Sequence, residues 1–491
     1  MGHNGYQHGI SLLAGWLPLT VEVMAIVLGM IVLARRSRRW WLVWIPVAAA
    51  VGGLSVWLTY RYWTSAGLSS DPPPATLWWW IGATVAMLVV AVVGAARTQW
   101  WRRAASVLAV ALTVLATGIT INQWVGYFPT VQEAWAQMTA GPLPDQVDPS
   151  TLASLRIPTP PPSQAATTHA ATTAASTSAI TPMQTGKVVS LTTDSSISHF
   201  AHRTEYVYLP PAWFVGRTPP QLPVLMMISG EFNTPADWLR TGNAISTIDA
   251  FARAHGGNAP ILVFPDVGGS FNNDTECVNG PRGNVADHLT DEVRPAVISQ
   301  FHASASAANW GVVGWSMGGT CAVDLVTMHP DTFTTFEDIA GDAAPSSGNK
   351  AQTISRLFGG NAAAYAAFDP ATAMARHGRY SGVHGWFAEA TGSRRAHPGH
   401  RGGAGHHWSP HGVGGNGLGG RDGTHLPPGS EVAAAAQLCS DAQRVGIDCT
   451  IHDRPDGHTW QFASTAFADA LATLAHDIEV PGVDAPTTGR T

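Results

Sequence analysis

The chain has 491 residues, enough for two or three domains, of which 12% are charged and 20 are tryptophan. Its formal net charge of −6 is mild, which argues against a nucleic-acid partner. The apolar residues are distributed unevenly. Before about residue 125 they form runs of membrane length, and afterwards they follow the pattern of a globular protein.

Four apolar runs are each long enough to cross a hydrocarbon layer of about 30 Å. They lie near residues 12–34, 40–60, 76–96 and 105–125. No basic residue precedes the first run, so a cleaved signal peptide is not predicted. Arginines cluster at 35–39 and 97–103, and the positive-inside rule places both loops in the cytoplasm. We therefore predict an integral, multi-pass anchor over residues 1–126 in the cell membrane, with both chain ends outside the cytoplasm.

The segment 127–186 is predicted to be a linker. Between about residues 141 and 185 it consists mostly of Pro, Ala, Thr and Ser, which cannot bury enough apolar surface to offset the entropy of ordering. Strand-like and helix-like stretches then alternate over residues 187–478. This alternation predicts an α/β domain with a mostly parallel sheet flanked by helices. Residues 479–491 are predicted to form a disordered tail.

The stretch Gly314-Trp315-Ser316-Met317-Gly318 has the pattern G-x-S-x-G between an apolar strand and a helix. A serine in this context sits on a strained turn that exposes its hydroxyl at the end of the sheet. A plain turn between a strand and a helix is the alternative. A triad on such a fold follows the order Ser, acid, His, and His458 lies after the last predicted strand. Ser316 and His458 are therefore the candidate nucleophile and base.

Several stretches resemble the putative-esterase family of α/β-hydrolases, which includes esterase D, feruloyl esterases and the antigen 85 mycolyltransferases. They are "GWSMGGTCAVDLVTMHPD", "PDGHTW", "PVLMMISGEFNTPADWL" and "FPDVGGSFNNDTECVNGPRGN". The membrane part, with "WVGYFPTVQ" and "AGPLPDQ", is similar to the anchor of actinobacterial envelope esterases. The resemblance implies an α/β-hydrolase fold, serine ester chemistry and no metal or cofactor.

Carried over to this chain, the resemblance implies an oxyanion hole formed by the N–H groups of Met317 and Glu231. The chain departs from the family pattern here, because Ser229 replaces the usual His or Asp and an acid follows Gly230. The family's acid is expected soon after the strand "HGWFAEA". If the Gly/His-rich insertion at 391–420 is looped out, Asp422 takes that place.

Glu389, inside that strand, is the alternative acid, and Glu431 is a third candidate. Glu431 has its own structural explanation, because an acid at a helix start stabilises the helix dipole. The insertion carries His397, His400, His406, His407 and His411. Their irregular spacing predicts a glycine-rich flap over the site rather than a metal centre.

All four cysteines lie in the C-terminal half, which fits two disulfides outside the cytoplasm. Cys439 is on a helix and Cys449 on the strand that follows it, so these neighbouring elements can be bridged. Cys277 and Cys321 then pair by elimination.

The favoured interpretation is a membrane-anchored extracytoplasmic serine esterase that acts on an ester or lipid-acyl substrate. One alternative is an acyltransferase, similar to mycolyltransferases, that moves lipid acyl groups onto envelope glycans. The other is a non-catalytic binding protein with a hydrolase fold. Acyl chain, leaving group and oligomeric state stay open at this point.

The topology can be checked on intact cells. Protease added from outside should cut within residues 141–185 and release the C-terminal domain, because exposed polar segments are the preferred sites of cleavage. Immunoblotting of the medium measures the release. A domain that becomes cleavable only after lysis would contradict the predicted orientation.

Overall fold

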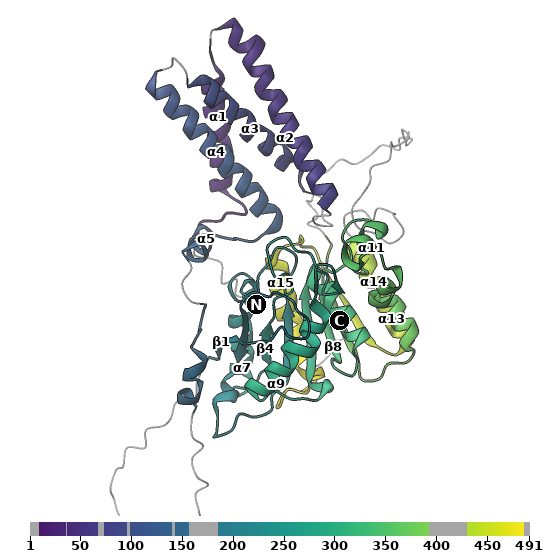
Figure 1. Cartoon of the computed structure of the whole chain (residues 1–491). Helices are drawn as coiled ribbons and strands as arrows, with labels where there is room; N and C mark the ends of the chain where they lie inside the picture. Colours follow the sequence, from purple (N-terminus) through teal and green to yellow (C-terminus); the bar gives the residue numbers. More distant parts are fainter. Residues whose placement is uncertain are drawn as a thin grey trace, which may run out of the picture.

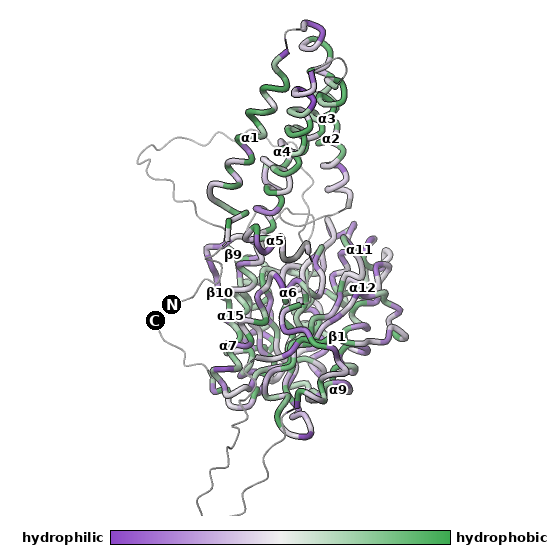
Figure 2. The backbone as a smooth tube through the Cα atoms, turned by 90° about the vertical axis from the view of Figure 1, so that its left-hand side faces the viewer, coloured by the Kyte–Doolittle hydropathy of each residue, from purple (hydrophilic) through white to green (hydrophobic). Residues whose placement is uncertain are grey.

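The computed structural model describes residues 9–35, 37–66, 73–95, 99–139, 143–156, 185–391 and 430–485. Within these ranges a bundle of four long helices lies next to an α/β domain (Figure 1). The helices are α1 (Trp16–Leu33), α2 (Ile45–Ala66), α3 (Ala75–Gly94) and α4 (Trp100–Val125), and a π-helical turn (Trp40–Trp44) leads into α2. Each helix is long and apolar enough to cross a membrane, and apolar residues dominate the bundle in Figure 2. Four spans were predicted at these places.

The two ends of the bundle have different surroundings. At one end, Arg35 Nη2 donates to the Gly94 carbonyl oxygen over 3.3 Å, and Arg102 reaches the carbonyl end of α1. At the other end, Gln461 Nε2 of the α/β domain donates to the Gly126 carbonyl oxygen over 2.7 Å. The arginines and the α/β domain therefore lie at opposite ends of the bundle, as the predicted topology requires.

Part of the expected linker has regular structure. It contains α5 (Val131–Met138) and a 3₁₀-helix (Pro149–Leu155), and Leu152 is buried in the main core of the α/β domain. Gln146 forms a β-bridge with Val188. Residues 143–156 thus pack on the domain, and the Pro/Ala/Thr/Ser-rich segment 157–184 lies outside the described residues.

An eight-stranded sheet forms the centre of the α/β domain, in the order β1-β2-β4-β3-β7-β8-β9-β10. Its strands are β1 (Lys187–Leu191), β2 (Glu205–Leu209), β3 (Val224–Ile228), β4 (Ile261–Phe264), β7 (Trp310–Trp315), β8 (Thr335–Ile339), β9 (His384–Ala390) and β10 (Asp448–Arg454). Strand β2 is antiparallel to both of its neighbours, and all other neighbours are parallel. A separate hairpin pairs β5 (Asn279–Gly280) with β6 (Gly283–Asn284). The chain has the predicted α/β-hydrolase fold.

Helices cover both faces of the sheet, so the central strands are buried on both sides. Side chains of a strand alternate between faces, and on β3 Val224 and Met226 enter one core. Leu225 and Met227 enter the other. The first core is covered by α9 (Arg294–Phe301), α10 (Met317–Met328), α13 (Pro370–His377) and α14 (Ser430–Val445), and the second by α6 (Asp237–Arg240), α7 (Ala244–Ala254) and α15 (Trp460–Asp477). The remaining elements are α8 (Val285–Asp287), a π-helical turn (His288–Val293), α11 (Lys350–Phe358), α12 (Ala362–Phe368) and 3₁₀-turns at Pro211–Phe214 and Ala307–Asn309.

Both predicted disulfides are confirmed. Cys277–Cys321 joins the loop after β4 to α10, and Cys439–Cys449 joins α14 to β10. The first closes a sequence separation of 44 residues and the second a separation of 10.

The two disulfides should differ in their effect on stability. Replacing both Cys277 and Cys321 by Ala should lower the free energy of unfolding by about 4 kcal/mol. The same change at Cys439 and Cys449 should lower it by about 3 kcal/mol, because a longer closed loop restricts the unfolded chain more. Denaturant unfolding without reductant, with the wild type as reference, measures both losses. A greater loss for the shorter loop would contradict this account.

Candidate active site

Ser316 occupies a sharp turn between the end of β7 and the start of α10. Its φ of 58° and ψ of −121° lie in a region that a non-glycine residue rarely adopts. The turn is possible because the backbones cross closely at two glycines. A Cβ at residue 314 would lie 1.6 Å from the Gly318 carbonyl oxygen, and one at residue 318 would lie 2.4 Å from the Ile228 carbonyl oxygen. The Ser316 N–H donates to the Ile339 carbonyl oxygen over 2.9 Å, which holds the strained turn against β8.

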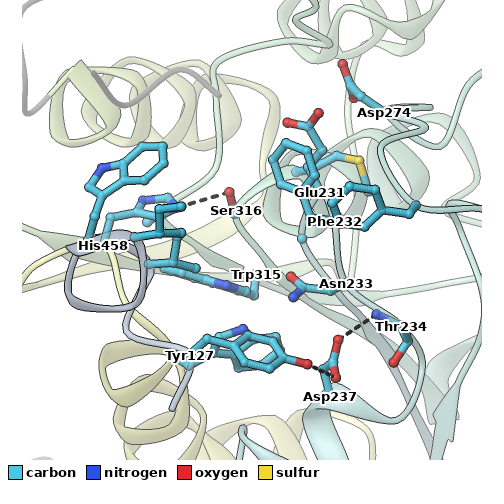
Figure 3. A pocket seen from close by; sticks show the side chains of 18 of the residues that line it. Tyr127, Glu231, Phe232, Asn233, Thr234, Asp237, Asp274, Trp315, Ser316 and His458 are labelled. Atoms are coloured by element: carbon cyan, nitrogen blue, oxygen red, sulfur yellow. Dashed lines mark hydrogen bonds between the residues drawn. The ribbon is translucent and has the colours of Figure 1, made fainter. Parts of the chain in front are cut away.

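His458 meets Ser316 from the loop between β10 and α15. Its Nε2 lies 3.0 Å from Ser316 Oγ (Figure 3). The imidazole packs on the Trp315 ring, with 4.2 Å between ring centroids. The next residue, Thr459, caps α15, because its hydroxyl accepts a hydrogen bond from the Phe462 N–H. His458 is therefore held between a capped helix and the tryptophan beside the serine, and the predicted pair is brought together.

Glu431 is the carboxylate beside the other side of the imidazole. It lies in the first turn of α14, is buried, and has Oε1 at 3.4 Å from His458 Nδ1. Sequence reasoning ranked it below Asp422, because an acid at a helix start is ordinarily explained by the helix dipole. Asp422 itself lies outside the described residues. Since the acid and the base are far apart in sequence, only the fold reveals that they meet.

Glu389 does not have the properties of a triad acid. It lies in β9 and is fully buried. Burial, reinforced by the negative charges of Asp338 and Glu431, raises the pKa of its carboxyl to about 10. It is therefore protonated at neutral pH, whereas the acid of a triad must be negative to stabilise the imidazolium. The alternative assignment of the acid to Glu389 is not supported.

The two predicted oxyanion donors flank the serine. Met317 is the first residue of α10, so its N–H lies at the positive end of the helix dipole. The turn after β3 touches the serine from the other side, since a Cβ at Gly230 would lie 3.1 Å from Ser316 Cβ. Glu231 follows in that turn. Burial raises the pKa of Glu276, and the negative charge of Glu231 adds to the shift, so the two carboxyl groups interact.

A cavity of about 600 Å³ opens onto Ser316 and His458. On one side it is lined by four carboxyl groups, here called the acidic wall: Glu231, Asp274, Glu276 and Asp342. Burial raises the pKa of Asp274 to about 6, although Arg282, at 3.2 Å, acts in the opposite direction. Burial and the charge of Asp274 raise the pKa of Glu276 well above its ordinary value. These acids come from loops after three different strands, so no single sequence motif predicts that they lie together.

Among the described residues, one cluster of histidine and glutamate side chains has the spacing that a metal site would need. His202, Glu205 and His288 have potential ligand atoms within 4.8 Å of one another. These atoms are already engaged: His288 Nε2 lies 3.0 Å from Glu205 Oε1 and its Nδ1 lies 2.7 Å from Glu292 Oε2. His202 Nε2 is 3.0 Å from the Thr193 hydroxyl. The group is a hydrogen-bonded network within the domain, and its residues do not line the cavity. The histidines predicted in the insertion lie outside the described residues.

Comparison with known proteins gives matches of different extent. The sequence profile of the family described as putative esterase matches residues 200–467, more than half of the chain. An uncharacterised protein of Corynebacterium glutamicum is 35% identical over 211 residues, which are 42% of this chain and 49% of that protein. The match therefore spans about half the length of this curated relative. Among solved structures, an S-formylglutathione hydrolase of Agrobacterium tumefaciens aligns with 19% identity and a TM-score of 0.44, over 60% of this chain and 97% of that one. MPT51 of Mycobacterium tuberculosis aligns with 15% identity and a TM-score of 0.38, over 58% and 99%.

Glu389→Gln should flatten the pH dependence of stability. The folded state holds the Glu389 proton up to about pH 10, whereas the unfolded chain releases it near its ordinary value. Between these values the folded state binds more protons, so the wild type loses up to about 1.4 kcal/mol of stability per pH unit as the pH rises. The variant should lack this contribution. Denaturant unfolding between pH 6 and pH 9 measures the slope, with Glu479→Gln as the exposed control. An unchanged slope in Glu389→Gln would mean that the buried carboxyl is charged.

Proposed function

Because this chain belongs to the putative-esterase family, as its resemblance predicted, we propose that it is a membrane-anchored serine hydrolase whose catalytic residues are Ser316, His458 and Glu431. It would hydrolyse carboxylic esters outside the cytoplasm. The observation that carries this proposal is the 3.0 Å contact between Ser316 Oγ, on its strained turn, and His458 Nε2. A non-catalytic binding protein would have no use for this strain.

The arrangement supports acyl transfer through a covalent intermediate. His458 Nε2 takes the hydroxyl proton while Ser316 Oγ attacks the carbonyl carbon of the ester. The oxygen that becomes negative faces the N–H groups of Met317 and Glu231. His458 then gives its proton to the leaving alkoxide, and the acyl group stays on Ser316.

Water completes the cycle. His458 takes a proton from water, the hydroxide attacks the acyl carbon, and the Ser316 oxygen leaves and regains the proton as the free acid departs. Glu431, on the Nδ1 side, holds the orientation of the imidazole and stabilises its positive form in both half-reactions. Besides the ester, the cycle consumes only one water molecule.

An acceptor other than water is the second candidate. The acidic wall offers carboxyl oxygens in the cavity that also contains Ser316, and such oxygens accept hydrogen bonds from hydroxyl groups of a sugar or other polyol. A bound hydroxyl could then replace water in the second half-reaction. The fraction of acyl group transferred to an added alcohol, measured against free acid, separates acyltransferase from hydrolase.

Three observations support a location of the domain outside the cytoplasm. The helices are long enough to span a membrane, and the arginines lie at the end of the bundle away from the domain. The domain contains two disulfides, which persist in oxidising compartments. We infer that the cavity faces the outer side of the cell membrane.

Ser316→Ala should abolish labelling by a fluorophosphonate probe and lower ester turnover by several orders of magnitude. His458→Ala should cost about as much, because the two residues act as a unit. Glu431→Gln should cost less but still lower kcat substantially, since the imidazole loses the charge that orients it. Turnover of 4-nitrophenyl acetate by the full chain in detergent measures these effects.

Ser299→Ala, at an exposed serine of α9, is the matched control and should retain full activity. Thermal unfolding must show that each variant is folded. A folded Ser316→Ala protein that still takes up the probe would place the nucleophile elsewhere. Full activity in Glu431→Gln would instead leave the acid role to a residue such as Asp422.

A further inference from the structure

The cavity at Ser316 continues from the α/β domain into the helix bundle. Its lining includes Trp63 of α2 and a run of residues near the end of α4, among them Gly118 and Trp124. The Trp63 and Trp124 rings contact each other, with 5.5 Å between centroids. Tryptophan is the residue that gathers where a membrane meets water. The membrane helices thus form a wall of the same cavity that contains the candidate nucleophile.

One face of α4 lines this cavity over two turns. Gly118, Ile121, Asn122 and Val125 all contribute, and their spacing of i, i+3, i+4 and i+7 places them on a single helix face. The polar atoms of Asn122 are engaged with the backbone of Phe128, at 2.8 and 2.7 Å, so they do not make this face polar. Ile121 and Val125 are exposed. The face is therefore apolar and accessible.

From the length of α4, we expect the cavity to reach the depth of the lipid chains. Helix α4 has 26 residues and is thus about 39 Å long, whereas the hydrocarbon layer is about 30 Å thick. If the extra helix length of about 9 Å is divided equally between the two ends, the hydrocarbon layer begins about 5 Å along the helix from Val125. Gly118 lies about 10 Å from Val125 along the helix, which is inside the hydrocarbon layer.

The end of α4 is fixed beside the catalytic histidine. A Cβ at Gly126, which ends the helix in a left-handed conformation, would lie 2.6 Å from Thr459 Cβ. The Tyr127 hydroxyl donates to an Asp237 carboxylate oxygen (Figure 3). The wall formed by α4 is therefore held in place by direct contact with the residue after His458.

The α/β domain contributes both acidic and aromatic side chains to the cavity, whereas the residues that α4 contributes include no carboxyl group. The acidic wall lies in the α/β domain, and the apolar face lies on α4. An acyl chain avoids buried carboxyl groups and gains from apolar contact. We therefore expect the acyl chain of an ester at Ser316 to lie along α4, with its leaving group toward the acidic wall.

We propose that Ser316 acts on long-chain lipid esters taken from the bilayer, with the acyl chain bound along the face of α4 formed by residues 118, 121, 122 and 125. This inference rests on the proposed function and adds its substrate class. The membrane helices are then part of the substrate site as well as the anchor. A lipid that diffuses within the membrane reaches the serine without passing through water.

Gly118→Leu tests the acyl site. A Cβ at Gly118 meets no atom within 4 Å, so a leucine fits and fills the deep end of the cavity. Gly53→Leu is the matched control, because residue 53 is also an exposed helix position with no atom within 4 Å and does not line the cavity. The full chain is reconstituted in phosphatidylcholine vesicles and assayed with 4-nitrophenyl acetate and 4-nitrophenyl decanoate. In Gly118→Leu the ratio of kcat/KM for decanoate to that for acetate should fall at least tenfold, and in Gly53→Leu it should equal that of the wild type.

Two further measurements make the outcome decisive. Ile121→Phe adds bulk to the same face closer to Ser316 and should lower the same ratio, so the test does not depend on one variant. Fluorophosphonate labelling shows which variants are folded. A labelled Gly118→Leu protein with an unchanged ratio, or an equal fall in Gly53→Leu, would overturn the acyl site and leave the proposed function standing. A wild type that takes up no probe would overturn both.

Discussion

The close crossing of β7 and α10 is the constraint on which the site depends. The absence of side chains at residues 314 and 318 lets strand and helix approach until their backbones touch. The chain can then reverse direction at Ser316, whose backbone conformation costs about 1–3 kcal/mol. The surrounding structure offsets this cost, because β7 is buried along its whole length and α10 is buried from Met317 to Thr327. The disulfide at Cys321 adds a covalent restraint one turn beyond the serine.

A second constraint is the electrostatic repulsion between carboxyl groups that are buried near the carboxyl ends of the parallel strands. Burial raises the pKa of Glu389, and the nearby charges of Asp338 and Glu431 raise it further. Burial also raises the pKa of Asp338, to about 7. A proton on the most buried of these groups removes repulsion that would otherwise act on its neighbours. Because Glu389 is neutral, Glu431 can lie beside His458 without a negative charge on Glu389 repelling it.

The sequence predicted those parts of the site that depend on local chain geometry. The turn at Ser316 follows from two glycines within five residues, and the place of His458 follows from chain order in this fold. The four spans and both disulfide pairs could also be predicted, because length, composition and neighbouring elements decide them. The sequence ranked Glu431 too low, because its contact with His458 depends on how α14 packs against β9 and β10. The acidic wall could not be predicted, because its residues meet only when three loops assemble.

The same reasoning explains why the sequence did not predict the proposed contribution of α4 to the cavity. In sequence, Gly118 and Ile121 are two members of an apolar run, and composition assigns the whole run to the lipid. The folded structure shows that the helix ends beside the loop that carries His458, through the contacts of Gly126 with Thr459 and with Gln461. A flexible tether at this point would leave the chemistry independent of the bilayer. Here the helix end and the catalytic loop are packed together, so movement of α4 relative to the domain would disturb His458 and the apolar wall at once. In the proposed function, α4 would therefore hold the chain in the bilayer and also line the side of the cavity from which a lipid substrate enters.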